Sequence, residues 1–159
     1  MRILLVDDHP EVRISLAAFI DQLGHESLQT DNGPDAVALT RRDKPDLVLS
    51  DLRMPGMDGL QLLHALEATD NPPPLALMTA FGDAETAIRA LRMGAIDYLR
   101  KPIDVRELHR LIERVQTTHA TPTLLTTPMG IREEADGLVR YGQALNRVIA
   151  LCDRLHSAT

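Results

Sequence analysis

The chain has almost no cysteine and no long hydrophobic run. Its single cysteine, Cys152, excludes an internal disulfide bond and is typical of proteins in a reducing compartment. The first apolar run, residues 3–6, is too short for the core of a signal peptide, and no run of membrane-spanning length follows it. We therefore expect a cytoplasmic protein with no membrane segment.

Positive charge is also scarce. The chain of 159 residues has a net charge of −6, and its lysines and arginines form no basic block. A surface that binds nucleic acid normally needs such a block, so we expect no direct nucleic acid binding by this chain. The remaining composition, 44% hydrophobic and 25% charged residues, is ordinary for a folded protein. The length suits one domain with an appendage.

Short apolar runs alternate with segments of helical periodicity through the first 116 residues. Most of the helical segments end at a Gly or a Pro, both of which stop helices. Five such units predict an α/β fold of the flavodoxin-like, doubly wound type, with a five-stranded parallel sheet in the order 2-1-3-4-5 and five helices. The predicted strands are residues 3–6, 27–29, 47–49, 75–78 and 98–99, and the predicted helices are residues 12–23, 34–42, 60–66, 84–93 and 105–115.

The character of the chain changes after this region. We assign residues 1–119 to the α/β domain, residues 120–137 to a linker rich in Thr and Pro, and residues 138–159 to an amphipathic helix. This helix has too little chain around it to bury its apolar stripe alone. It must therefore dock on the first domain, pair with another chain, or belong to something larger.

Polar residues stand where four of the predicted strands end. Asp7 and Asp8 follow the first strand, Asp51 follows the third, Thr79 the fourth and Lys101 the fifth. Ligands of open α/β sheets bind outside the carboxyl ends of the strands, so these side chains should converge on one pocket. Three carboxylates, a hydroxyl and an ammonium in one pocket can hold a divalent cation and accept a phosphoryl group.

The three aspartates favour a metal site over simpler roles. Asp7 and Asp8 precede a helix, and one of them could cap it, but a cap needs only one Asp. Three carboxylates close together repel one another unless a cation lies among them, and Mg²⁺ prefers such oxygen ligands. The turn after Asp51 is already formed by Pro and Gly residues, so this carboxylate is free to act as a nucleophile toward phosphorus.

The remaining candidates give weaker signals when each is taken alone. Thr79 could be an ordinary residue at a strand end, and Tyr98 an ordinary strand aromatic that is half buried. Lys101 is one of two lysines in the chain, and it precedes Pro102, so a cis peptide bond there would aim the ammonium inward. We interpret His9 as a solvated loop residue.

Taken together, these residues resemble the receiver domain of two-component response regulators. The matching pieces are Val6-Asp7-Asp8, Ser50 through Gly59, Thr79-Ala80-Phe81 and Tyr98 through Pro102. The resemblance implies that Asp51 accepts phosphate from a sensor histidine kinase, while Asp7, Asp8, Asp51 and the backbone carbonyl of Arg53 bind Mg²⁺. It further implies that Thr79 and Lys101 bind the phosphoryl oxygens and that Tyr98 turns inward when Thr79 moves. Pro102 has a structural role.

Within this family the motifs are most similar to the nitrogen-regulation (NtrC-like) activators of sigma-54-dependent transcription. The resemblance implies an output ATPase and a DNA-binding domain, which are absent from this chain, and residues 138–159 resemble the lead-in to that ATPase. The implied output surface is the fourth helix, fifth strand and fifth helix. In the fifth helix we expect Val105, Leu108, Ile112 and Val115 to pack on the sheet, with a homodimer as the alternative use of this stripe.

Three alternatives compete with a phosphorylation-driven switch. The first is an interaction module that is receiver-like but independent of phosphate. The second is a phosphatase with an aspartyl nucleophile, which would want a second carboxylate just after Asp51, where Leu52 and Arg53 stand. The third is a flavin-binding module. Its phosphate loop would have to be the segment after the first strand, and the acidic residues there would repel phosphate. We expect a regulatory domain that is not an enzyme but assists its own phosphorylation and dephosphorylation.

Overall fold

The computed structural model describes residues 1–80 and 84–119. Within these ranges all strands are parallel and lie in the order β2-β1-β3-β4-β5, which confirms the predicted doubly wound fold. The predicted linker and C-terminal helix lie outside the described residues. The strands are β1 Arg2–Val6, β2 Glu26–Thr30, β3 Leu47–Asp51, β4 Leu75–Thr79 and β5 Asp97–Arg100, and the helices are α1 Pro10–Gln22, α2 Gly33–Asp43, α3 Gly59–Glu67, α4 Ala84–Arg92 and α5 Val105–His119.

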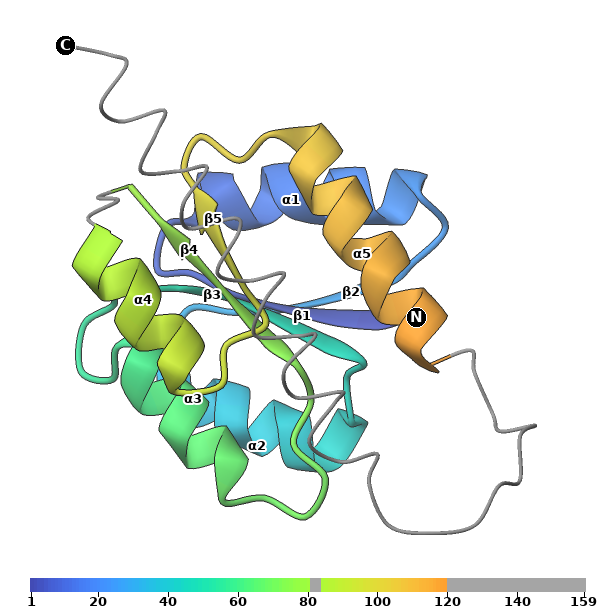
Figure 1. Ribbon diagram of the computed structural model, residues 1–159. Coiled ribbons are helices and arrows are strands. Elements are labelled where there is room, and N and C mark those ends of the chain that lie inside the picture. The colour runs from blue at the N-terminus through green and yellow to red at the C-terminus, as the bar shows by residue number, and fades with distance from the viewer. Residues whose placement is uncertain (81–83, 120–159) are drawn as a thin grey trace, which may run out of the picture.

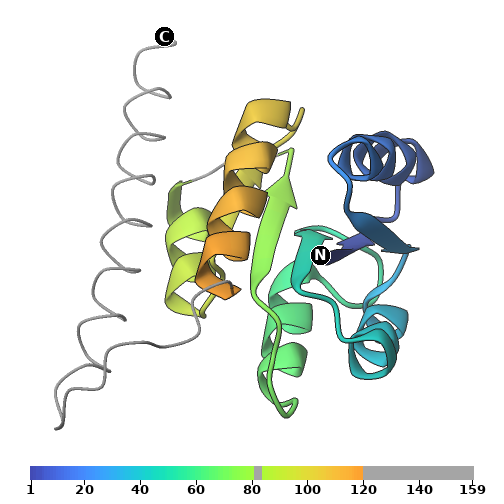
Figure 2. The same cartoon turned by 90° about the vertical axis from the view of Figure 1, so that its right-hand side faces the viewer.

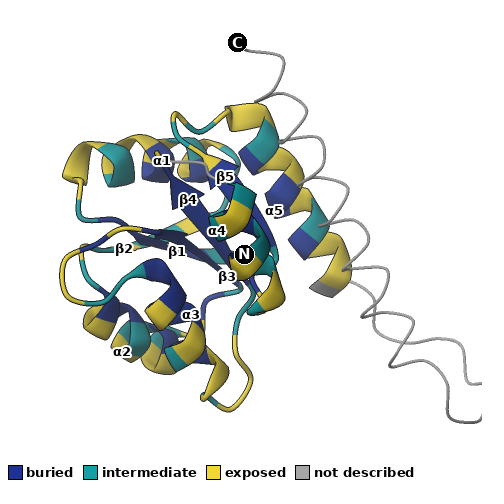
Figure 3. Ribbon diagram, turned by 60° about the vertical axis from the view of Figure 1, so that its left-hand side comes forward, coloured by how far each residue is buried: buried dark blue, intermediate teal, exposed yellow. Residues whose placement is uncertain are grey.

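Helices cover both faces of the sheet, so the molecule has two hydrophobic cores. Helices α1 and α5 lie on one face, and α2, α3 and α4 lie on the other (Figure 1). Side chains alternate between the faces along each strand: in β1, Ile3 and Leu5 join the first core, while Leu4 and Val6 join the second. The central strands are buried on both sides (Figure 3), which explains their uninterrupted apolar sequences.

The helices begin and end where local chemistry requires it. Asp58 and Gln61 form a reciprocal capping box at the start of α3, and the Asn32 side chain accepts a hydrogen bond from the backbone at the start of α2. Gly24 follows α1 with φ of 80° and Gly94 follows α4 with φ of 100°. Only glycine adopts these left-handed values without strain, so both positions stop their helices as expected.

The helices are placed in pairs at the two ends of the sheet. Figure 2 shows α4 and α5 beside the β4–β5 end, and α1 and α2 toward the β1–β2 end.

None of the helices in the described ranges is long and apolar enough to cross a membrane. Because the strands are parallel, the carboxyl ends of β1, β3, β4 and β5 lie at one edge of the sheet.

The packing of α5 differs from the prediction at one residue. Leu108, Ile112 and Val115 are buried against the sheet, but Val105 is 51% exposed. Val105 is the first residue of α5, one turn ahead of Leu108, so it lies before the part of the helix that reaches the core. The expectation that all four residues pack on the sheet is therefore wrong for Val105.

We expect the substitution Thr40→Val in α2 to raise the free energy of unfolding by about 1 kcal/mol. Thr40 is 5% exposed, and its hydroxyl oxygen has no hydrogen-bond partner among the residues that the structure describes. Valine has nearly the same shape and removes the cost of burying that hydroxyl. Urea unfolding measures the change.

The matched control for this prediction is Thr69→Val. The Thr69 hydroxyl donates a hydrogen bond to the Leu66 carbonyl oxygen at 2.6 Å, so the same substitution there should destabilise the protein. A Thr40→Val protein that is less stable than the wild type would show that the buried hydroxyl is satisfied, for example by a water molecule.

Candidate functional site

The polar residues singled out in the sequence lie at one edge of the sheet. Asp7 directly follows β1, Asp51 ends β3, Thr79 ends β4 and Lys101 directly follows β5. The parallel register aligns these ends, since Asp51 pairs with Met78 and Thr79 with Arg100. The adjacent strands β1 and β3 lead away from each other, β1 through α1 to β2 and β3 through α3 to β4, so the topological switch point where α/β sheets bind ligands lies between their carboxyl ends.

Lys101 joins two of the carboxylates. Its ammonium nitrogen Nζ lies 2.6 Å from Asp7 Oδ2 and 3.0 Å from Asp51 Oδ1. The Lys101 backbone N–H donates to the Thr79 carbonyl oxygen at 2.7 Å, and the Lys101–Pro102 peptide bond is cis. The side chain is 16% exposed, so this cation is held inside the pocket and faces both carboxylates.

Asp7 divides its two carboxylate oxygens between two neighbours. The residue is fully buried, and its Oδ2 takes the Lys101 contact. Its Oδ1 accepts a hydrogen bond from the His9 backbone N–H at 2.9 Å and lies 3.2 Å from the His9 ring nitrogen Nδ1. The Asp7 backbone carbonyl accepts a hydrogen bond from Arg13 in α1. These contacts anchor the acidic loop to the start of α1.

Neither aspartate after β1 caps the helix that follows. The residue at the N-cap of α1 is His9, and no side chain makes the capping hydrogen bond there. Asp8 Oδ1 is buried and makes no hydrogen bond among the described residues, although His9 Nδ1 lies 2.9 Å away. Helix capping therefore does not explain the acidic pair, whose two carboxylates both contact the His9 ring.

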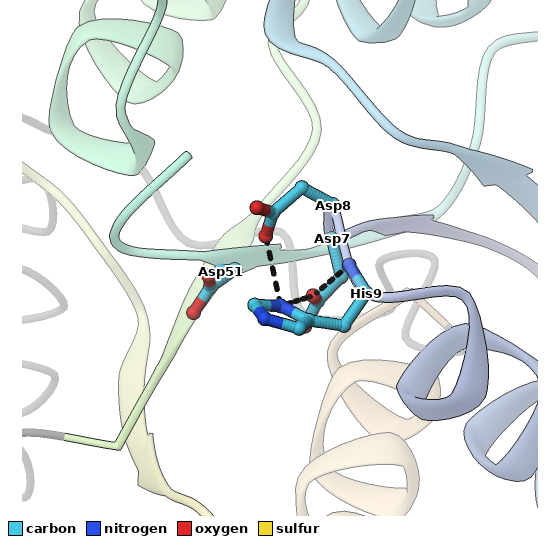
Figure 4. Close-up of side chains that lie close together, drawn as sticks. All are labelled: Asp7, Asp8, His9 and Asp51. Carbon is cyan, nitrogen blue, oxygen red and sulfur yellow. Dashed lines mark hydrogen bonds and ion pairs between the residues drawn. The ribbon is translucent and has the colours of Figure 1, made fainter. Parts of the chain in front are cut away.

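The carboxylates form a cluster that fits a divalent cation. One ligand atom from each of Asp7, Asp8, His9 and Asp51 lies within 4.8 Å of the others, and Figure 4 shows these side chains close together. The clearest sign of a fit is that three carboxylates lie together here with one ammonium, Lys101, and the partly exposed His9 ring as the basic groups that contact them in the described residues. Three carboxylates supply the oxygen ligands that Mg²⁺ prefers.

The electrostatics of the pocket agree with a site for a cation. Burial raises the pKa of Asp51, and the charges of Asp7 and Asp8 add to this, while Lys101 opposes it. For Lys101, burial alone would lower the pKa, but the bonds to Asp7 and Asp51 raise it. The ionised carboxylate of Asp51 is thus disfavoured in the protein alone, and a divalent cation would relieve that cost.

The other predicted residues lie at the end of β4, in β5 and in the loop after β3. Thr79 is 1% exposed, and Tyr98 is 8% exposed and packs in the core on the face of α2, α3 and α4. The alternative, an ordinary strand aromatic that is half buried, is therefore wrong as to burial. Arg53 lies in the loop after β3 with an exposed side chain. Its role through the backbone carbonyl stays a prediction, as do the switch roles of Thr79 and Tyr98.

The sequence analysis underrated His9. It placed this residue in solvent, and the ring is indeed 56% exposed, but its Nδ1 lies against both Asp7 and Asp8. The hydrogen bond to Asp7 and the charge of Asp8 raise the pKa of the His9 imidazole. The position of His9 directly after Asp7 and Asp8 could have indicated these contacts. A search for histidines at the spacing of metal ligands does not detect such a position.

The loop between β3 and α3 is held close to Asp51 by glycine. The Leu52 N–H donates to the Met78 carbonyl oxygen and the Gly59 N–H donates to the Leu52 carbonyl oxygen, each at 2.8 Å. A Cβ atom on Gly59 would lie 2.6 Å from the backbone oxygen of Asp51. The start of α3 can therefore approach the end of β3 only because this residue has no side chain.

Comparison with known proteins gives one consistent result. Residues 3–113 match the family model described as the response regulator receiver domain. The chain is 42% identical over 113 residues to the regulatory protein AtoC of Escherichia coli, a match that covers 71% of this chain and 24% of AtoC. It is 40% identical over 116 residues to protein PilH of Pseudomonas aeruginosa, covering 72% of this chain and 96% of PilH.

Two further matches concern the longer segment and the fold. The DNA-binding transcriptional regulator NtrC of Proteus hauseri is 32% identical over 151 residues, a match that covers 95% of this chain and 32% of NtrC. The crystal structure of the BeF3-activated N-terminal receiver domain of Klebsiella pneumoniae RstA superimposes with a TM-score of 0.68 at 32% identity, covering 73% of this chain and 99% of that one. The chain thus spans nearly all of PilH but only about a quarter to a third of AtoC and NtrC.

Proposed function

Because the chain belongs to the response regulator receiver domain family, we propose that it is a switch driven by phosphorylation of Asp51 by a sensor histidine kinase. The observation that carries the proposal is the position of Asp51. Its carboxylate ends β3, is 5% exposed, contacts the Lys101 ammonium and lies in one cluster with Asp7 and Asp8.

The proposed reaction is a direct phosphoryl transfer. An oxygen of the Asp51 carboxylate forms a bond to phosphorus, and the bond between phosphorus and the donor's imidazole nitrogen breaks, with the electron pair staying on that nitrogen. Lys101 is placed to bind a phosphoryl oxygen, since its Nζ already lies 3.0 Å from Asp51 Oδ1. In this way the domain supplies part of the catalysis of its own phosphorylation.

Asp7, Asp8, Asp51 and the backbone carbonyl of Arg53 are the groups that would hold Mg²⁺ in this proposal. Bound there, the ion would neutralise negative charge on the phosphoryl group that is transferred. Neighbouring residues hold two of these carboxylates in place: Asp7 contacts Lys101 and the His9 backbone N–H, and Asp51 contacts Lys101.

The phosphorylated pocket would then act on its surroundings. A phosphoryl group on Asp51 adds about two negative charges, by analogy with other phosphorylated side chains. The Thr79 hydroxyl and Lys101 gain a new acceptor, so the loop after β4 is pulled toward Asp51 and the region of α4 and Tyr98 repacks. A coupling of about 1–3 kcal/mol between phosphorylation and this repacking would shift the two populations roughly 5- to 150-fold.

The output we propose is control of transcription. The similarity to AtoC and NtrC supports it, and NtrC is a DNA-binding transcriptional regulator. Because the chain spans only part of those proteins, an output ATPase and DNA-binding domain would lie outside it. We propose residues 120–137 as the linker and residues 138–159 as the lead-in to that output. Homodimerisation through the α4–β5–α5 surface belongs to the same proposal.

Intact mass spectrometry tests the proposed function. The full chain is incubated with a small-molecule phosphodonor, once with Mg²⁺ and once with a chelator. We expect one added phosphoryl group with Mg²⁺ and little or none with the chelator, because the carboxylate cluster then repels the donor. If the protein binds Mg²⁺ but gains no phosphoryl group from any donor, the proposal fails and a phosphate-independent interaction module takes its place.

A further inference from the structure

Arg13 links helix α1 to the acidic loop that precedes it. Its guanidinium nitrogen Nη1 donates a hydrogen bond to the backbone carbonyl oxygen of Asp7, six residues earlier in the chain. Helical side chains lean toward the N-terminus of their helix, so Arg13, near the start of α1, can reach back to the residue that follows β1. No side chain caps α1, and Arg13 supplies a connection between loop and helix that a capping residue would otherwise make.

The Asp7 carbonyl belongs to the peptide bond that joins the two acidic residues. This bond is planar, so the direction of the carbonyl oxygen also sets the direction in which the chain enters Asp8. The Asp7 N–H donates to the carbonyl oxygen of Thr30, the last residue of β2, at 3.2 Å. Asp7 is fully buried, so its carbonyl oxygen needs a partner within the protein. The backbone that carries both carboxylates is therefore held by Thr30 on one side and by Arg13 on the other.

Arg13 acts on the site through the backbone and not by neutralising its charge. Its guanidinium binds a carbonyl oxygen, whereas the Lys101 ammonium contacts the carboxylates themselves. Among the charges that shift the pKa of Asp51, the cation is Lys101. Groups that orient metal ligands without touching the ion typically change metal affinity by about 10- to 100-fold when they are removed.

We infer that Arg13 is a positioning residue, which holds the carboxylates of Asp7 and Asp8 in the arrangement that binds a divalent cation. A guanidinium suits this role, because it presents several N–H donors in a rigid, planar fork. The inference rests on the proposed function only in placing a cation at these carboxylates. It adds a residue of α1 to the site and makes the affinity for the cation depend on one hydrogen bond to the backbone.

Isothermal titration calorimetry of the full chain with MgCl₂ tests this inference. Arg13→Met keeps an unbranched side chain and removes the donor, and Arg13→Lys keeps a donor at the end of a similar chain. The matched control is Arg41→Met, since Arg41 is an exposed arginine of α2. Far-UV circular dichroism and urea unfolding establish that each variant is folded during the titration, and Arg13→Gln replaces Arg13→Met if the latter is not.

We expect the dissociation constant for Mg²⁺ to rise at least about tenfold in Arg13→Met. Arg13→Lys should fall between this variant and the wild type, and Arg41→Met should bind Mg²⁺ as tightly as the wild type. Phosphoryl uptake by Arg13→Met should be slow at low Mg²⁺ concentration and return to the wild-type rate when Mg²⁺ is saturating. A residue that served only the stability of the fold would not produce this dependence on Mg²⁺.

Wild-type Mg²⁺ affinity in Arg13→Met would overturn the inference, even if that variant is less stable, because Arg13 would then serve the fold alone. Equal weakening in Arg13→Lys and Arg13→Met would also overturn it, since a retained donor would then have no effect. A wild type that binds no Mg²⁺ would overturn both proposals. A wild type that binds Mg²⁺ but takes up no phosphoryl group would end the proposed function alone, because tenfold weaker Mg²⁺ binding in Arg13→Met would still support the positioning role.

Discussion

Replacing Asp51 with asparagine is expected to abolish phosphoryl uptake. An amide oxygen is a poor nucleophile and bears no full negative charge, and Lys101 would lose one of its two anionic contacts. Intact mass spectrometry after incubation with a phosphodonor and Mg²⁺ should show no phosphoryl group on Asp51→Asn and one on the wild type. The control is Asp70→Asn, which changes an exposed aspartate in the loop between α3 and β4 and should leave uptake intact.

The same substitution should make the metal-free protein more stable at neutral pH. Burial is the main cause of the raised pKa of Asp51, and Asp7 and Asp8 add to it. The folded state therefore holds the Asp51 proton more tightly than the unfolded chain, so the wild type loses stability as the pH rises from the usual aspartate pKa through the raised one. Asparagine does not titrate and avoids this loss.

Thermal unfolding in the presence of a chelator measures this difference. Asp51→Asn should unfold at a higher temperature than the wild type at pH 7, and the gap in unfolding temperature should close as the pH falls below the usual aspartate pKa, where Asp51 is protonated in both states. A variant that unfolds at a lower temperature at pH 7 would mean that the Lys101 contact outweighs the cost of the buried charge.

Gly59→Ala is expected to lower the free energy of unfolding by about 3 kcal/mol, at the upper end of what overpacking costs. The added Cβ would lie 2.6 Å from both the Asp51 backbone oxygen and Leu77 Cδ2, and 3.0 Å from the Cα of Leu52. Two of these atoms belong to the backbone and cannot turn away, so β3 and α3 must separate. Urea unfolding measures the loss of stability.

The matched control is Gly33→Ala, at the first residue of α2. A Cβ there would meet only the Met57 side chain among its three nearest atoms, at 2.6–2.7 Å. Methionine has three rotatable bonds and can move, so the cost should be smaller than at Gly59. Equal costs at the two positions would contradict the argument that backbone contact at Gly59 is decisive.

Gly59→Ala should also slow phosphoryl uptake, even under conditions where the variant is fully folded. The clash falls on the backbone oxygen of Asp51 itself, and a displacement on the order of 1 Å in a reacting group can cost about 100-fold in rate. Uptake measured well below the unfolding transition separates this effect from loss of folded protein. An unchanged rate would mean that α3 moves and the end of β3 stays in place.

The fold could be predicted because its signals are local. A short apolar run predicts a buried strand, and an apolar stripe of period 3.6 predicts a helix, wherever in the fold their partners lie. Five alternating units leave few topologies once right-handed crossovers are required, and the order β2-β1-β3-β4-β5 is the one observed. The weakest prediction was β2, because its sequence Glu26–Thr30 is at the sheet edge and only partly buried.

The convergence of Asp7, Asp51 and Lys101 was also within reach of the sequence. Each follows or ends a predicted strand, and parallel strands put their carboxyl ends at one edge. The sequence could not predict that Lys101 contacts both carboxylates, with its Nζ 2.6 Å from Asp7 and 3.0 Å from Asp51. It contains no information on how far a side chain reaches across neighbouring strands. The sequence also could not predict that residue 59 must be glycine. That requirement arises because α3 approaches β3 so closely that a Cβ atom would not fit.

Signals between neighbours along the chain were enough to predict the order of elements, the alternation of buried strands and amphipathic helices, and the acidic and basic residues at strand ends. The folded structure was needed to show that His9 turns toward Asp7 and Asp8, that Val105 is exposed at the start of α5, and that Tyr98 is buried. These three features depend on contacts between segments that are distant in sequence, or on which local conformation the packing selects. Neither kind of information appears as a periodic pattern in the sequence.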